Sequence, residues 1–252
     1  TGWRLPGVSG PVCVVFEKEL KTLLSSPKAR LLVAVPFFLL ILLKIIGAAP
    51  LFRYLWGDAW AAVVLALLVA YVLSVLAGQF FSNGFGYDGP GVRQVFSLPQ
   101  PPEVWLAGRN LAQAALALAQ FTGLGLLLFV LMPGAGVRAI ALPVASFPFG
   151  LLVLLGLGNL LGARYPRRFH MSLARRDRPV GASFAWVLAC LGGCTLLVLA
   201  MTGLAPDRGA GLWVALAPLP LLGAGIYALL LPVAACWTRA GRERIIDAIA
   251  RP

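Results

Sequence analysis

The sequence predicts an all-α integral membrane protein, with an N-terminal interfacial helix followed by six transmembrane helices. Hydrophobic residues make up 60% of the 252-residue chain and charged residues only 12%, about half the charged fraction of an average soluble domain. The apolar residues occur in runs close to the roughly 20 residues that cross a bilayer. The charged residues gather between these runs. A soluble globular protein is therefore excluded.

A short amphipathic segment precedes the first apolar run. Between residues 12 and 25, apolar side chains recur at helical spacing, whereas Glu17, Lys18 and Lys21 fall elsewhere. The apolar stripe consists of Phe16, Leu20, Leu23 and Leu24. Such a helix is too polar to cross a bilayer, so we expect it to lie in the cytoplasmic interface before Pro27 turns the chain inward. A solvated lead-in is the alternative.

Six apolar runs are expected to cross the membrane. They are residues 31–47, 59–81, 110–131, 139–161, 181–201 and 212–236. Only the first contains a charged residue, Lys44, and several contain prolines that are expected to bend the helices. The chain is thus divided into a cytoplasmic N-terminal segment (1–28), a transmembrane domain (29–237) and a cytoplasmic tail (238–252).

The basic residues lie almost entirely on one side of this six-span arrangement. Of 21 Lys and Arg residues, 17 fall before residue 31, in the loops 82–109 and 162–180, or in the tail. Basic residues in short loops favour the cytoplasmic side, so both termini are expected in the cytoplasm. The net charge of +12 is then mainly a topology signal. A nucleic-acid surface would need exposed aromatic side chains among the basic ones, and nucleic acid is not expected as a partner.

Groups that carry enzymatic chemistry are scarce in this sequence. The single histidine, His170, lies in an arginine-rich stretch, where contact with solvent or lipid headgroups is expected rather than catalysis. No acidic residue falls within a predicted span, and the four cysteines form no zinc pattern. No lysine follows a glycine, as a phosphate-binding loop requires. We therefore assign no catalytic, cofactor-binding or metal-binding residue.

The connection between the second and third spans, residues 82–109, is long for such a chain. Asp88 and the Gly-Pro pair after it predict a helix start, and Pro99 ends the helix. Three apolar side chains fall within it at i, i+3 and i+4: Val92, Val95 and Phe96. They are expected to present an apolar surface to a partner, while Arg93 pairs with an acidic residue of that partner. An ordinary loop with a membrane-facing patch is the alternative.

Two stretches resemble permeases of the ABC-2 transporter family. Residues 16–21 read Phe-Glu-Lys-Glu-Leu-Lys, and Ser26-Pro27 follows them, which resembles the elbow helix of these permeases. The segment from Asn83 to Ala112 is similar to a motif of one bacterial branch, N-x-F-G-x-D-G-x-G-x-R…P…G-[KR]-N-L-A. The likeness covers most of the chain.

The resemblance implies a function and a set of partners. The chain would be the membrane-spanning subunit of an ATP-driven exporter in the bacterial inner membrane, with no enzymatic activity or cofactor of its own. ATP and Mg²⁺ would be held by a separate nucleotide-binding subunit, which in this family docks on the first cytoplasmic loop. In this chain the docking residues would be Asp88, Val92, Arg93, Val95 and Phe96. A second permease unit would complete the transporter, either another copy or the other half of a longer chain.

Two other classes stay open from the residues alone. One is a membrane-embedded lipid-modifying enzyme that would hold phosphate on the basic loop 162–180. The other is a non-catalytic membrane scaffold. Neither the transported substrate nor the direction of transport follows from the sequence.

Overall fold

The described part of the chain contains helices and no strand. The computed structural model describes residues 3–47, 60–131, 137–167, 185, 188–190, 192–196 and 210–250. The helices are α1 (Gly10–Ser25), α2 (Pro27–Gly47), α4 (Trp60–Gln79), η2 (Phe81–Gly91), α5 (Val92–Ser97), α6 (Pro102–Leu131), α7 (Val137–Arg164), α9 (Ala210–Leu216), α10 (Pro218–Ala240) and α11 (Arg242–Ala250). The predicted all-α class is confirmed for these residues.

Five helical stretches are long and apolar enough to cross a membrane. They are Pro27–Gly47, Val63–Ser97, Pro102–Leu131, Pro143–Arg164 and Trp213–Ala240. They correspond to the first four predicted spans and the sixth. The fifth, 181–201, lies mostly outside the described residues, although those described within it are helical. His170 and the part of the loop 162–180 beyond residue 167 also lie outside them.

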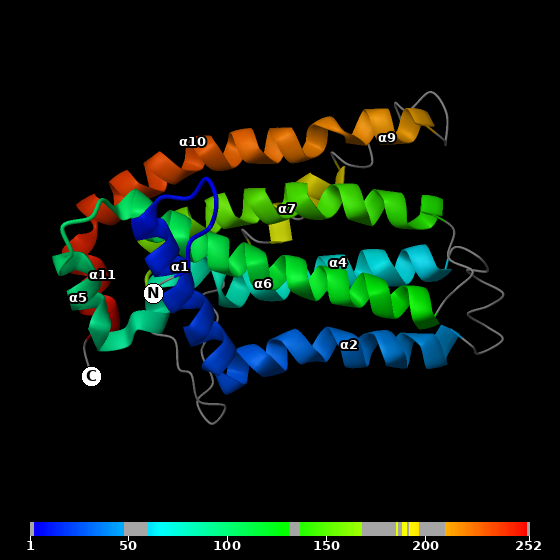
Figure 1. Cartoon of the computed structure of the whole chain (residues 1–252), viewed down its shortest axis with the longest axis horizontal. Helices are drawn as coiled ribbons and strands as arrows, with labels where there is room; N and C mark the ends of the chain where they lie inside the picture. The colour runs from blue at the N-terminus through cyan, green and yellow to red at the C-terminus, as the bar shows by residue number, and fades with distance from the viewer. Residues whose placement is uncertain are drawn as a thin grey trace.

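The long helices lie side by side in an elongated bundle (Figure 1). One end, which we call the loop end, carries α1, α5 and α11, and α9 begins at the opposite, far end. The chain runs away from the loop end in α2 and α6 and back toward it in α4, α7 and α10. Accordingly α7 ends at the loop end, whereas α9 begins at the far end.

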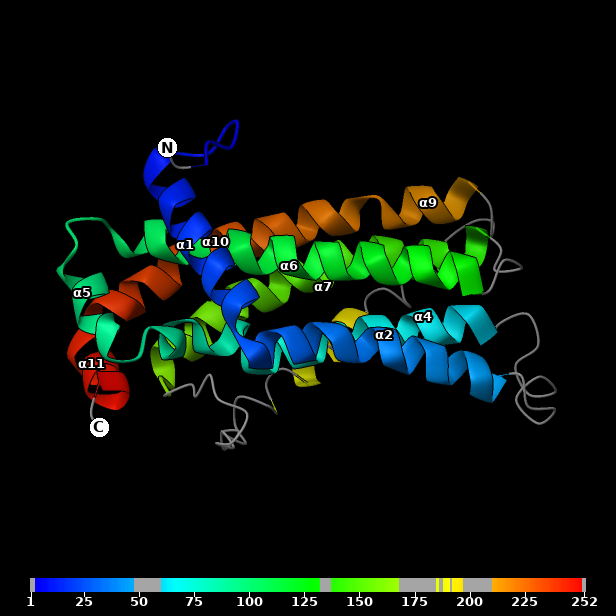
Figure 2. The ribbon, with the colours of Figure 1, turned by 60° about the horizontal axis from the view of Figure 1, so that its bottom comes forward.

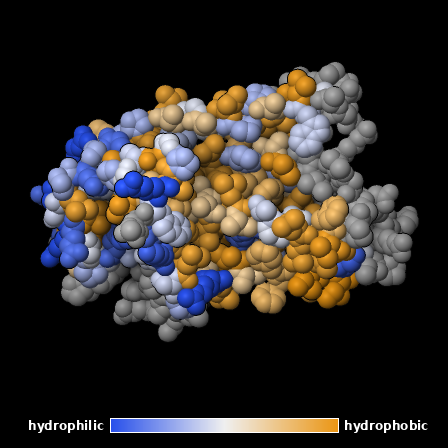
Figure 3. Space-filling view, in the orientation of Figure 1, coloured by the Kyte–Doolittle hydropathy of each residue, from blue (hydrophilic) through white to orange (hydrophobic). Residues whose placement is uncertain are grey.

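The bundle is apolar both inside and outside. Its core includes the fully buried side chains of Leu40, Leu68, Leu124 and Phe147, from four different helices. The ring of Phe147 also stacks on Phe121, with 4.2 Å between centroids. On the surface, hydrophobic residues cover much of the bundle and hydrophilic residues gather at the loop end (Figure 3). An apolar belt of this kind is unfavourable in water and suits a lipid environment.

A proline divides the last apolar stretch into two helices. Helix α9 ends at Leu216 and α10 begins at Pro218, which lacks the N–H that would continue the hydrogen-bond ladder. The amide N of Ala217 still donates to the carbonyl of Trp213 at 2.9 Å, so the two helices stay nearly continuous. The predicted span 212–236 is therefore a bent pair of helices that extends to Ala240.

Helix α1 crosses the loop end at an angle to the bundle axis (Figure 2). Phe16 and Leu23 are buried against the bundle and Leu20 is partly buried, whereas Leu24 is 52% exposed. The predicted apolar stripe therefore packs mostly on the protein's own core. Of the four residues of this stripe, only Leu24 is exposed to the surroundings.

Two glycines permit close contacts at the loop end. A Cβ atom at Gly108 of α6 would lie 2.6 Å from the Cβ of Val15 in α1. A Cβ at Gly158 of α7 would lie 2.6 Å from the backbone of Phe81 in η2. Both distances are too short for any larger residue, so these glycines set how closely α1 and η2 approach the bundle.

Candidate functional site

The connection after α4 has structure of its own. The short helix α5 covers Val92–Ser97, inside the predicted range 88–99, and the 3₁₀ segment η2 precedes it. Gly89 has a φ of +50°, a left-handed conformation that glycine adopts without a steric penalty. After Leu98 the chain enters α6 at Pro102, eight residues before the predicted start of the third span.

Four charged side chains from three segments meet beneath this connection. This charge cluster consists of Lys18 and Glu19 of α1, Asp88 of η2 and Arg109 of α6. Lys18 Nζ lies 2.6 Å from Asp88 Oδ1 and 3.1 Å from Glu19 Oε1. Arg109 donates from Nε to Glu19 Oε1 at 3.1 Å and from Nη2 to Asp88. The cluster therefore ties α1, the loop and α6 together.

Most of the charge cluster is withdrawn from solvent. The side chains of Arg109, Asp88 and Glu19 are only 3%, 5% and 8% exposed, whereas Lys18 is half exposed. Two positive and two negative groups balance, which burial requires because an unpaired buried charge is very costly. The Arg109 guanidinium also lies over the Phe85 ring, 4.8 Å from its centroid, in a cation–π contact.

The ionised form of Asp88 is favoured in this setting. Burial by itself raises the pKa of the Asp88 carboxyl, but the charges of Arg109 and Lys18 outweigh burial, so this pKa lies below its ordinary value. Asp88 therefore stabilises the fold above its unfolded-state pKa of about 3.9. That contribution is lost as the pH falls from there through the lower folded-state pKa.

A groove opens between α1 and α5 above the charge cluster. It has a volume of about 410 Å³. Its lining residues are Lys18, Glu19, Thr22, Tyr87, Asp88, Gly91, Gln94, Val95 and Leu98. The lining of this α1–α5 groove combines charged residues of the cluster with the apolar Val95 and Leu98. It can receive a side chain of a partner that carries both characters.

The apolar side chains of α5 do not form the exposed surface that the sequence predicts. Val92 is fully buried and Phe96 is 7% exposed, because both pack in a cluster with Ile245 and Ile249 of α11. The Phe96 ring also meets Trp105 edge-on, at 5.4 Å between centroids. The expectation that only a partner would cover them is wrong, since the C-terminal helix of the same chain does so.

The outward face of α5 is polar. Arg93, Gln94 and Ser97 are exposed, as is Leu98 just after the helix. Val95 is half-buried and lines the α1–α5 groove. Of the five residues predicted for docking, Arg93 and Val95 are thus accessible and Asp88 lines the groove as part of the charge cluster, while Val92 and Phe96 are buried.

The charged residues on the outer side of α1 pair locally. Lys21 Nζ lies 2.5 Å from Glu17 Oε1, as expected at i,i+4 spacing, and Glu17 Oε2 accepts the backbone N–H of Trp3 at 3.0 Å. The ring of Phe16 lies 5.9 Å from that of Trp3. These contacts fold the start of the chain back over α1.

Two arginines donate hydrogen bonds to backbone carbonyls at the C-terminal ends of α4 and α7. Arg167 donates to the carbonyl of Gly78 at 2.9 Å and to Ser82 Oγ at 3.1 Å, at the end of α4. Arg244 of α11 donates to the carbonyl of Ala163 at 2.8 Å, at the end of α7. Carbonyls at helix C-termini have no partner within the helix. Arg244 provides a donor for Ala163, and Arg167 adds a second donor to the carbonyl of Gly78, which also accepts from Ser82 Oγ at 3.2 Å.

The structure brings together the two stretches on which the family resemblance rests. Glu19 belongs to the first stretch, while Asp88 and Arg109 belong to the second. Sequence reasoning assigned no role to Glu19 or Arg109. The available signal was a glutamate at a buried helical position of α1, three residues after Phe16 and four before Leu23.

Among the described residues, no group of three His, Cys, Asp or Glu side chains is placed to hold a metal ion. The chain was compared with protein-family models, curated proteins and solved structures. None of them matches. The likeness to ABC-2 permeases therefore rests on the two sequence stretches alone.

Proposed function

We propose that this chain is the membrane-spanning subunit of an ATP-driven exporter of the ABC-2 type. A separate nucleotide-binding subunit would bind at the loop end, and a second permease unit would complete the translocation path. The observation that carries the proposal is the charge cluster, which locks the loop after α4 to both α1 and α6. A force applied to such a loop would be passed to a spanning helix, since the buried ion pairs resist separation.

The proposed docking surface is the outward face of α5 together with the α1–α5 groove. Arg93, Gln94 and Leu98 supply one cationic, one neutral polar and one apolar contact. Helix α11 lies against the other side of α5 and supports it through Ile245 and Ile249. The packing of α5 on α11 holds the loop in place, and a surface that transmits force needs such support.

Placing two negative charges on this face tests the proposal. In the double variant Arg93→Glu, Leu98→Glu, we expect at least a tenfold loss of the nucleotide-binding subunit from the purified complex, because both contacts become unfavourable. Mass spectrometry of the purified chain should identify a Walker-motif ATPase with the wild type. The control is Arg4→Glu, another exposed basic residue, which should retain the subunit. Full retention by the double variant would place the interface elsewhere.

We further propose six crossings with both termini in the cytoplasm. The opposite positions of the end of α7 and the start of α9 (Figure 1) support one additional passage between them. The polar character of the loop end, where α1 and α11 lie, supports the orientation.

Reporter fusions test this topology. Alkaline phosphatase fused after residue 252 should be inactive and a green fluorescent protein there should be fluorescent, because the tail is cytoplasmic. Phosphatase inserted at residue 208 should be active on the outer side. An active phosphatase at residue 252 would show that the number of crossings is odd or that the orientation is reversed.

The elbow role of α1 also belongs to this proposal. Val14 and Leu24 are exposed apolar residues of this helix, and the exposed lysines Lys18 and Lys21 lie near them. The charge of Lys18 is paired with Asp88 and Glu19 and that of Lys21 with Glu17, so the exposed apolar residues carry the argument for the interface. A position in the membrane interface would accommodate both kinds of side chain.

A further inference from the structure

A lateral pocket of the bundle is separate from the charge cluster and the α1–α5 groove. It has a volume of about 300 Å³, within the lower range of small-molecule sites. Leucines of α7 form much of its lining, and Ala77 of α4 and Trp237 of α10 complete it. Most of its lining residues are apolar, so the pocket suits an apolar ligand.

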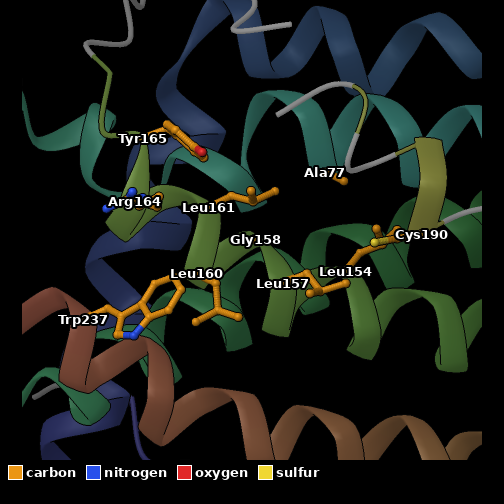
Figure 4. A pocket seen from close by; sticks show the side chains of 10 residues that line it. All are labelled: Ala77, Leu154, Leu157, Gly158, Leu160, Leu161, Arg164, Tyr165, Cys190 and Trp237. Atoms are coloured by element: carbon orange, nitrogen blue, oxygen red, sulfur yellow. The ribbon is translucent and has the colours of Figure 1, made fainter. Parts of the chain in front are cut away.

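The pocket is polarised along its length (Figure 4). Arg164, Tyr165 and Trp237 lie at one end, whereas Leu154 and Cys190 lie at the other. Because α7 ends at Arg164, the polar end faces the loop end of the bundle. The ten residue-to-residue steps from Leu154 to Arg164 rise about 15 Å in a helix, which is half of a hydrocarbon core about 30 Å thick.

Arg164 differs from the neighbouring arginines. Arg167 and Arg244 are engaged with helix-end carbonyls. Arg164 is exposed, and no described residue forms a hydrogen bond or an ion pair with its side chain. A guanidinium at the mouth of an apolar pocket matches a phosphate, which it can bind through two parallel hydrogen bonds.

We propose that this pocket binds one acyl chain of an anionic phospholipid from the leaflet at the loop end, with its phosphate on Arg164. The apolar wall of α7 would contact the chain from the headgroup level to the bilayer midplane. Trp237, 44% exposed at the polar end, would lie at the depth that indole rings favour. The net charge of the lipid matters because Arg164 has no acidic partner among the described residues. This site does not depend on the exporter function.

Native mass spectrometry of the full chain released from detergent micelles tests the proposal. Phosphatidylglycerol and phosphatidylcholine with identical acyl chains are titrated separately. We expect phosphatidylglycerol to bind the wild type at least tenfold more tightly than phosphatidylcholine does. We expect Arg164→Gln to abolish that preference, because both lipids carry the same phosphate diester and it is the positive charge of Arg164 that repels the choline cation of phosphatidylcholine. Arg4→Gln, which removes another exposed basic residue, should keep the preference.

A second variant tests the apolar part of the pocket. Leu161→Trp fills space beside the half-buried Leu161 and leaves Arg164 in place, so phosphatidylglycerol affinity should fall at least tenfold. Circular dichroism and gel filtration establish that each variant is folded, and Arg164→Gln decides alone if Leu161→Trp does not fold.

Three kinds of outcome would overturn the proposal. The first is a missing contrast: the wild type binds the two lipids equally, or the wild type and Arg164→Gln bind phosphatidylglycerol equally. The second is full displacement of phosphatidylglycerol by inorganic phosphate alone, which would mean an anion site without an acyl chain. The third is a lipid-free dimer that Leu161→Trp dissociates, which would make a second copy of the chain the occupant.

Discussion

Replacing Arg109 with methionine is expected to lower the free energy of unfolding by about 3–5 kcal/mol, the range for breaking a buried ion pair. The variant leaves Glu19 and Asp88 buried beside a single, half-exposed lysine. Unfolding in mixed detergent and dodecyl sulfate micelles measures the change. The matched control is Lys21→Met, which breaks an exposed i,i+4 pair with Glu17 and should change the stability by less than about 0.5 kcal/mol.

A compensated variant separates charge from packing at this position. In the triple variant Glu19→Gln, Asp88→Asn, Arg109→Met, the one charge of the cluster left without a partner is that of the half-exposed Lys18, so much of the lost stability should return. If Arg109→Met were as stable as Lys21→Met, the cluster would be solvated and would not lock the loop. If the triple variant stayed as unstable as Arg109→Met, the loss would come from packing.

Truncating Phe96 to alanine is expected to destabilise the protein itself by about 3–5 kcal/mol, as for other buried phenylalanines. Its ring fills the space between Phe85, Trp105 and the apolar face of α11. The same unfolding measurement applies. Leu98→Ala, a truncation of an exposed residue two positions later, should stay within about 0.5 kcal/mol of the wild type.

This result would change how a transport defect in Phe96→Ala is interpreted. Loss of transport would then follow from a loosened loop end and would not identify a binding contact. A Phe96→Ala variant with wild-type stability would instead indicate that α11 does not cover α5, and would return Phe96 to the candidates for docking.

The membrane-spanning helices of the described chain could be predicted from the sequence because their signal is local. A run of about 20 apolar residues usually forms one transmembrane helix. Five of the six predicted runs correspond to spanning candidates. Spans and helices do not share their ends: α6 begins at Pro102, eight residues before the predicted span, because Trp105 and Leu106 pack into the loop-end core.

The charge cluster could not be predicted because its members are far apart in the chain. Glu19 and Arg109 are separated by 90 positions, and Lys18 and Asp88 by 70. Apart from the position of Glu19 on the apolar face of α1, nothing local distinguishes these residues from solvated charges. Only the close packing of α1 on α6, which Gly108 permits, makes the first pair buried partners.

The role of α11 was missed for a different reason. The sequence predicts the tail only as a cytoplasmic extension, although Ile245 and Ile249 stand four residues apart, as on one face of a helix. A nine-residue helix is marginal alone and forms here because both isoleucines are fully buried against α5 and its neighbours. Recognising that face would have shown that Val92 and Phe96 already had a partner within the chain.

The most direct test of the proposed docking surface is site-specific photo-crosslinking from position 94. A photo-reactive amino acid replaces Gln94, which is exposed and lines the α1–α5 groove, and a second chain carries it in place of the exposed Leu126 of α6 as the control. We predict a crosslinked product with a Walker-motif ATPase from position 94 and none from position 126. An ATPase that co-purifies with the chain but crosslinks from neither position, or only from position 126, would contradict the proposed docking surface.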